Sequence, residues 1–143
     1  MTDASSVSLG AKTLSADYAG QPLTIEYGKL AQLSDGAVVV RLGETVVLAT
    51  AVVGSAREGG DFFPLTVDYE ERLYAAGKIS GSRFIKREGR PSENAILTAR
   101  LIDRPIRPLL PKECRNEIQL IVTVLAIDMI HDPDVRSSIS ASC

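Results

Sequence analysis

Three β-branched runs constrain the fold of this chain most strongly. GAVVVRL (36–42) and TVVLATAVVG (45–54) are separated only by Gly43-Glu44, the spacing of a two-residue hairpin turn with glycine at its first central position. The second run is apolar on both faces, which predicts a central strand. The third run, EIQLIVTVLAID (117–128), is the best candidate for a buried strand. The chain is therefore predicted to be built on a sheet.

Two further strands and a helix are predicted around these runs. QPLTIEYGKLA (21–31) alternates apolar and polar residues, as a half-buried strand does. FFPLTVDYEERLYA (62–75) is also predicted to be a strand, with Pro64 indicating a sheet edge or a bulge near its start. SENAILTARLIDR (92–104) is predicted to form a helix that Pro105 ends. The order of elements indicates a mixed α and β fold whose first half is mostly antiparallel.

The predicted helix has an apolar side and a charged side. Glu93, Arg100 and Arg104 are placed on the charged side. The proline-rich segment after the helix (104–112) is predicted to run extended, because proline breaks both helices and strand ladders. The apolar side is predicted to comprise Ile96, Leu97, Leu101 and Ile102.

One domain is predicted, at residues 21–143, preceded by a weakly tied arm at residues 1–20, which are small and polar. The tail DPDVRSSISASC begins a helix but stops about two turns in, with nothing after it to pack against. We therefore expect a fragment of a longer protein, with a domain incomplete at its C-terminus.

Composition favours a reducing compartment and excludes several classes of protein. The chain has two cysteines, too few for a disulfide framework or a zinc site. Its first 20 residues lack the apolar core of a signal peptide, and no stretch of 18 apolar residues exists that could cross a membrane. We expect a cytoplasmic protein with no membrane contact.

Charge is strongly segregated along the chain. Residues 72–115 carry eleven Lys and Arg against four Asp and Glu, whereas the whole chain has a net charge of −2. Residues 1–71 hold four basic and ten acidic side chains, and residues 116–143 hold one and four. Such segregation does not help to build a core, and it indicates a surface that meets phosphate or nucleic acid.

The glycine-punctuated segment 75–91 is the first candidate RNA-binding feature. Lys86, Arg87 and Arg90 can hold several phosphates, and the ring of Phe84 offers a surface on which a base can stack. The alternative is a solvated charged loop whose Phe84 packs inward.

Arg100, Arg104 and Arg107 extend this basic stripe. Arg100 and Arg104 are four residues apart, so they share a helix face and repel each other unless anions intervene. Asp103 could pair with Arg107 or with Arg100. The alternative interpretation of Arg104 and Arg107 is a structural network of ion pairs beside the prolines.

The residues show no self-contained active site. Asp68, Glu70 and Glu71 are more typical of a solvated strand end than of a divalent-cation site, and His131 lies in a turn sequence. Phosphate-loop, dinucleotide-binding and zinc motifs are absent from the sequence. We therefore assign no catalytic residue and no metal ligand to this chain.

Two stretches resemble a known family. GETVVLATA (43–51) resembles a strand motif of ribonuclease PH-type domains, and residues 61–111 resemble the first core domain of bacterial polynucleotide phosphorylases, most specifically in EGRPSE and RLIDRPIRPL. The resemblance covers about residues 20–140. It implies an α+β, ribonuclease PH-like fold of the ribosomal protein S5 domain 2-like class, a mixed sheet with helices on one side, here truncated.

The resemblance also implies a function. Members of this family are phosphorolytic 3′-to-5′ exoribonucleases that degrade single-stranded RNA in mRNA turnover, using inorganic phosphate and releasing nucleoside diphosphates. Three subunits form a ring, which further proteins of an RNA-degradation complex can join. Mg²⁺ or Mn²⁺ is held by a second core domain, outside this chain. The full-length protein is then the enzyme, and we expect the 143-residue chain alone to be inactive.

The family's RNA-gripping loop usually reads Phe-Phe-Arg-Arg, with a further arginine three residues on. Phe84, Arg87 and Arg90 match it, whereas Ile85 replaces an aromatic residue and Lys86 replaces an arginine. Lysine keeps the charge but lacks the planar fork of arginine. Arg100, Arg104 and Arg107 match the family's arginine-rich helix and turn. The alternative function is a non-catalytic RNA-binding or assembly subunit of an exosome-like ring.

Overall fold

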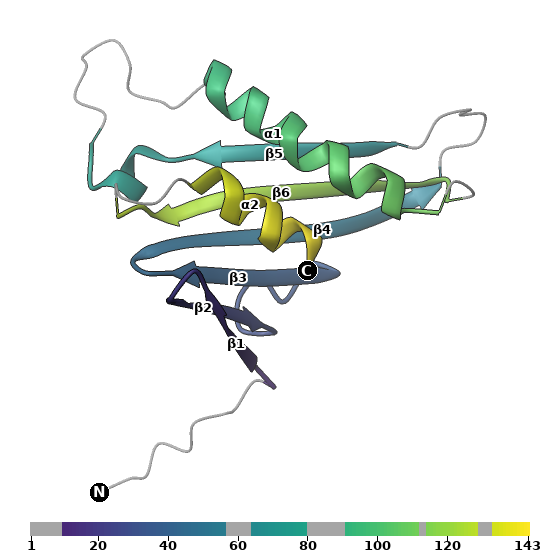
Figure 1. Cartoon of the computed structure of the whole chain (residues 1–143). Coiled ribbons are helices and arrows are strands. Elements are labelled where there is room, and N and C mark those ends of the chain that lie inside the picture. The colour runs from purple at the N-terminus through teal and green to yellow at the C-terminus, as the bar shows by residue number, and fades with distance from the viewer. Residues whose placement is uncertain (1–9, 57–63, 80–90, 112–113, 129–132) are drawn as a thin grey trace, which may run out of the picture.

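The described residues form a six-stranded sheet with two α-helices on one face (Figure 1). The strand order is β1-β2-β3-β4-β6-β5, and only β5 and β6 are parallel to each other. The predicted α+β class, with a mixed sheet and helices on one side, is confirmed. This computed structural model describes residues 10–56, 64–79, 91–111, 114–128 and 133–143.

The predicted hairpin forms the middle of the sheet. It consists of β3 (Gly36–Leu42) and β4 (Thr45–Ala56), in which Leu42 pairs with Thr45. Gly43 has a φ of 60°, the left-handed conformation that the first central position of this turn requires. β4 lies between β3 and β6, which confirms its prediction as a central strand.

β6 (Asn116–Ala126) is the buried strand that its composition predicts. It pairs with β4 on one side and with β5 (Leu65–Glu71) on the other, and Val122 and Val124 are fully buried. β5 is the outermost strand on its side, in agreement with the proline just before it. The strand predicted for 62–75 is too long at its end, because Leu73–Ala76 form a 3₁₀ turn, η1.

The prediction of a weakly tied arm at residues 1–20 is wrong for the second half of that segment. β1 (Lys12–Tyr18) pairs along its whole length with β2 (Gln21–Tyr27). A tight turn at Ala19-Gly20 joins the strands, with φ values of 55° and 79°. Every residue of β1 is exposed, so the strand is held by its ladder and its turn rather than by burial. Hydrophobic patterning gives no signal for such a strand.

Both helices cover the same face of the sheet and contact each other (Figure 1). α1 (Glu93–Ile106) packs against β5, and α2 (Pro133–Ser142) packs mainly against β4. The tail therefore does find a packing surface, contrary to expectation, and its Arg136, Ser137 and Ser140 are buried. The main core comprises Val47, Ala49, Tyr69, Ala75, Ala95, Ile102, Leu120, Val122 and Val124.

The buried side of α1 differs from the predicted one. Its buried residues are Ala95, Thr98 and Ile102, whereas Leu97 and Leu101 are 62% and 52% exposed. Small side chains line the contact because α1 lies close to β5 and α2. Of the four apolar residues predicted to face inward, Ile102 alone is buried.

The helix also continues through Pro105. The segment predicted to run extended contains the end of α1 at Ile106 and a 3₁₀ turn, η2 (Arg107–Leu109). Pro105 lies in the last turn, where its missing N–H removes only the bond to the Leu101 carbonyl. The backbone N–H of Arg107 still bonds to the Asp103 carbonyl, so the turn closes.

Candidate nucleic-acid interface

The structure describes part of the predicted RNA-binding set. Arg100 and Arg104 lie on α1, and Arg107 opens η2. The other four residues predicted to bind RNA precede α1 and lie outside the described residues. They are Phe84, Lys86, Arg87 and Arg90. The positions of the arginines on α1 and η2 are therefore the part of the candidate interface that the structure describes.

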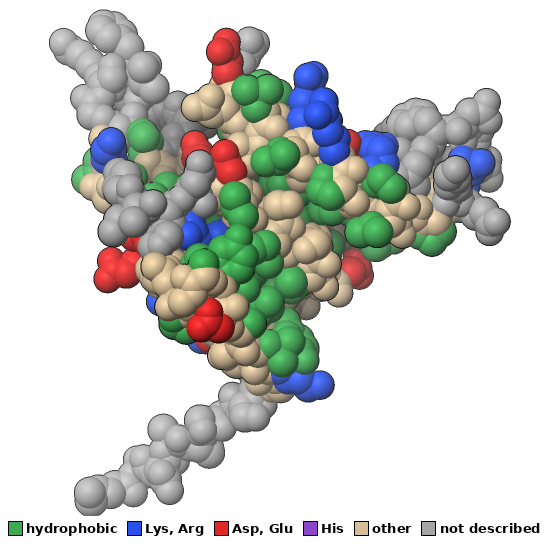
Figure 2. All heavy atoms as spheres, in the orientation of Figure 1, with side chains coloured by type: hydrophobic (Ala, Val, Ile, Leu, Met, Phe, Trp, Pro, Cys, Tyr) green, Lys and Arg blue, Asp and Glu red, His purple; other side chains and the backbone are tan. Residues whose placement is uncertain are grey.

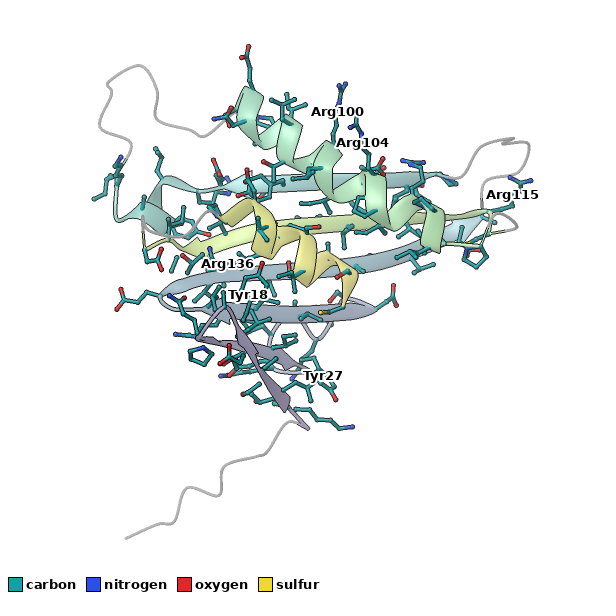
Figure 3. The ribbon with its side chains drawn as sticks, viewed as in Figure 1. Tyr18, Tyr27, Arg100, Arg104, Arg115 and Arg136 are labelled. Atoms are coloured by element: carbon teal, nitrogen blue, oxygen red, sulfur yellow. The ribbon has the colours of Figure 1, made fainter. Side chains whose placement is uncertain are left out.

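Arg100 and Arg104 project away from the sheet (Figure 3). The Ser92 hydroxyl caps the start of α1 by accepting from the Ala95 N–H at 3.1 Å, and the burial of Ile102 fixes which side of the helix faces out. Both arginines are exposed. In the space-filling view, Lys and Arg side chains stand out from the α1 end of the molecule (Figure 2).

Neither of these two arginines has a carboxylate partner among the residues that the structure describes. Four residues along an α-helix correspond to a rise of about 6 Å. The outer side of α1 thus presents two planar cations, one turn apart, that can each accept a phosphate in a bidentate contact.

Arg107 is held differently. Its Nη2 lies 2.8 Å from Asp103 Oδ1, and its Nε donates to Asp103 Oδ2 at 3.1 Å. Nη2 also donates to the Leu65 carbonyl oxygen of β5 at 3.3 Å. Of the two partners that spacing allowed for Asp103, the structure selects Arg107. Sequence reasoning missed the Leu65 carbonyl, since nothing local connects residues so distant along the chain.

A hollow of about 330 Å³ lies between α1 and β5. Ile96 and Ala99 of α1 and Val67 of β5 give it apolar walls. Its charged lining residues are Arg100 and the acidic Asp68, Glu70 and Asp103. Sequence periodicity gave no sign of this hollow, because it depends on how α1 is set against the edge strand.

Two of the acidic residues of β5, Glu70 and Glu71, are engaged in local contacts. Glu70 pairs with Arg72 at 2.7 Å, and the Tyr69 hydroxyl donates to Glu71 Oε1 at 3.0 Å. Burial, and then the Glu71 carboxylate, raise the pKa of Tyr69. Within the described ranges, no group of three or more His, Cys, Asp or Glu side chains could hold a metal ion. We therefore identify no magnesium ligand in this part of the chain.

Comparison with known proteins decides the family. RNase PH, the 3′ exoribonuclease family, domain 1, matches residues 19–143. This chain belongs to that family. The resemblance carried by EGRPSE and RLIDRPIRPL is thereby confirmed.

Polyribonucleotide nucleotidyltransferases are among the relatives in the same family. That of Roseiflexus castenholzii is 60% identical over 131 residues, and that of Thermomicrobium roseum is 63% identical over 130 residues. These alignments cover 91% and 90% of this chain but 17% and 16% of those proteins. The chain thus spans a small part of the length of the curated relatives it matches.

Solved structures share the fold at low sequence identity. A chain of the Archaeoglobus fulgidus exosome, solved with RNA bound to its active site, superposes with a TM-score of 0.58 at 19% identity. The match covers 92% of this chain and 48% of that one. An archaeal exosome core gives 0.53 at 18% identity. These likenesses support the fold assignment.

Neither helix in the described part of the chain has the length and apolar character needed to span a membrane.

Proposed function

We propose that this chain is an RNA-holding domain of a phosphorolytic 3′-to-5′ exoribonuclease that acts on single-stranded RNA. In that reaction, inorganic phosphate attacks the 3′-terminal phosphodiester and a nucleoside diphosphate leaves. The observation that carries the proposal is the outward pair Arg100 and Arg104, without carboxylate partners among the described residues, in a member of the 3′ exoribonuclease family.

The role of these arginines follows from electrostatics. An exposed Arg-Arg pair one turn apart is mildly destabilising for a helix, by a few tenths of a kcal/mol. A bound polyanion removes that repulsion and replaces it with charge-assisted hydrogen bonds. Lys86, Arg87 and Arg90 would add phosphate contacts, and Phe84 would add a stacking contact worth about 1–3 kcal/mol per base.

The rest of the assembly is part of the proposal. We place the chain in a homotrimeric ring in the cytoplasm, engaged in mRNA turnover and open to further proteins of an RNA-degradation complex. Mg²⁺ or Mn²⁺ would bind outside residues 1–143 and would neutralise charge at the reacting phosphate. The polyribonucleotide nucleotidyltransferase relatives support the enzyme class on which this arrangement is based.

RNA binding by the purified chain tests the proposal. Wild type should bind a fluorescein-labelled single-stranded RNA, and Arg87→Ala should weaken binding equally for oligo(A), oligo(U) and mixed sequences. Loss of one phosphate contact should also flatten the plot of log K against log salt by about 0.7. An unchanged slope, or weakening confined to one sequence, would contradict the phosphate role of Arg87.

Turnover by the chain alone is a separate test. We expect neither phosphate-dependent decay of RNA nor polymerisation of ADP, because no catalytic residue is assigned to this part of the protein. Measurable turnover, retained after removal of any co-purifying nuclease, would overturn the proposal that residues 1–143 hold RNA while the reaction takes place elsewhere.

A further inference from the structure

The basic residues at the end of α1 fall into two environments. Arg100 and Arg104 point outward with no carboxylate partner among the described residues. Arg107, only three residues further on from Arg104, donates to Asp103 from Nη2 at 2.8 Å and from Nε at 3.1 Å. Spacing does not explain the difference, since Asp103 is three residues from Arg100 and four from Arg107. One carboxylate therefore decides which guanidinium groups remain available.

The backbone explains why Asp103 takes Arg107. Pro105 leaves the Leu101 carbonyl without its usual backbone donor, although the N–H of Arg107 still closes the last turn of α1 on the Asp103 carbonyl. Arg107 bridges this turn to the first residue of β5 by donating to the Leu65 carbonyl at 3.3 Å. Arg107 is therefore bonded to Asp103 and to β5, whereas Arg100 and Arg104 project away from the sheet (Figure 3).

We propose that Asp103 is a boundary residue that limits the RNA-binding side of α1 to Arg100 and Arg104. Asp103 neutralises the charge of Arg107, which also bonds to the Leu65 carbonyl of β5. Arg107 then has a structural role, and Arg104 is the last arginine of this segment that is available to RNA. This inference rests on the proposed RNA-binding function and makes it more specific. It removes Arg107 from the residues predicted to contact RNA, and it gives Asp103 a role within a basic surface.

The test is the salt dependence of RNA binding by the intact chain, measured by fluorescence anisotropy on labelled oligo(A). Arg107→Ala should leave the slope of log K against log salt as in wild type, and so should Arg107→Lys. Asp103→Asn should release Arg107 and make the slope steeper by about 0.7, so that a tenfold dilution of salt strengthens its binding about fivefold more than that of wild type. The double variant D103N/R107A should return to the wild-type slope.

The double variant shows that the added contact comes from Arg107 and not from the lost negative charge alone. Arg41→Ala, which removes an exposed cation from β3, serves as the control for general electrostatics. Circular dichroism spectra matching wild type confirm that each variant is folded.

The outcomes separate this inference from the proposed function. If wild type binds RNA and Arg107→Ala flattens the slope by about 0.7, Arg107 contacts phosphate and the boundary role of Asp103 is wrong. If D103N/R107A keeps the steeper slope of Asp103→Asn, the inference is again wrong. If wild type binds no RNA, the proposed function fails and this inference fails with it.

Discussion

Thr98 on α1 donates a hydrogen bond to the Asp134 carboxylate on α2, with 3.0 Å between Oγ1 and Oδ1. Thr98 is only 4% exposed, and its bond joins the two helices that cover the sheet. It therefore ties the helix that carries the outward arginines to the C-terminal helix.

Replacing Thr98 by Val should lower the free energy of unfolding by about 1–2 kcal/mol, because the shape is kept while a hydrogen bond to a charged acceptor is lost. Urea denaturation monitored by circular dichroism measures the change. Thr66→Val on the exposed side of β5 is the matched control and should stay within about 0.5 kcal/mol of wild type. Equal effects of the two changes would show that the helix-to-helix bond contributes nothing.

Ile102 and Leu101 should respond very differently to truncation. Ile102 is fully buried in the core, so Ile102→Ala should cost about 2–5 kcal/mol, whereas Leu101 is 52% exposed and Leu101→Ala should cost less than about 1 kcal/mol. Chemical denaturation of both variants checks the orientation of α1. A larger loss for Leu101→Ala would mean that α1 is rotated from the orientation described.

Tyr69 should make the fold sensitive to alkali. Its pKa is raised, chiefly by burial and then by Glu71, so the folded state holds the phenol proton more tightly than the unfolded chain does. The stability contributed by Tyr69 is full below the unfolded-state pKa of about 10 and is lost as the pH rises from there towards the higher folded-state pKa.

Tyr69→Phe should remove this part of the alkaline loss while costing about 1–2 kcal/mol at neutral pH, where the bond to Glu71 is lost. Unfolding free energies measured from pH 7 to pH 11 make the comparison, with the exposed Tyr18→Phe as control. Parallel pH profiles for wild type and Tyr69→Phe would refute the assignment.

The turn between β1 and β2 is open to improvement. Ala19 has a φ of 55°, a left-handed conformation that alanine adopts at a cost of about 1–2 kcal/mol and that asparagine tolerates better. Ala19→Asn should therefore raise the melting temperature, by a gain of about 0.5–1 kcal/mol. Ala11→Asn, just outside β1, should leave it unchanged. No gain at position 19 would indicate that β1 frays before the protein unfolds.

Much of the sheet could be predicted because its signals are local. The Gly43-Glu44 spacing defines a hairpin, and the β-branched run before Asp128 defines a central strand, whatever surrounds them. β1 could not be predicted in this way, since all its residues are exposed and it is held by its ladder and its turn to β2.

The orientation of α1 could not be predicted from the local sequence pattern. Periodicity selects the largest apolar side chains as the buried ones, yet close approach to β5 and α2 leaves room for Ala95 and Thr98 and turns Leu97 outward. The candidate site has the same limit. Spacing allowed Asp103 to pair with either Arg100 or Arg107, and only the path of the chain past Pro105 to the edge of β5 decides between them.

The central claim is that the outward side of α1 binds RNA through Arg100 and Arg104. The most direct test compares the salt dependence of single-stranded RNA binding by wild type and by the double variant R100A/R104A, with Arg41→Ala as a charge control. We predict a slope of log K against log salt that is shallower by about 1.4 in the double variant, two contacts at about 0.7 each, and unchanged in the control. A double variant that keeps the wild-type affinity and slope would contradict the account.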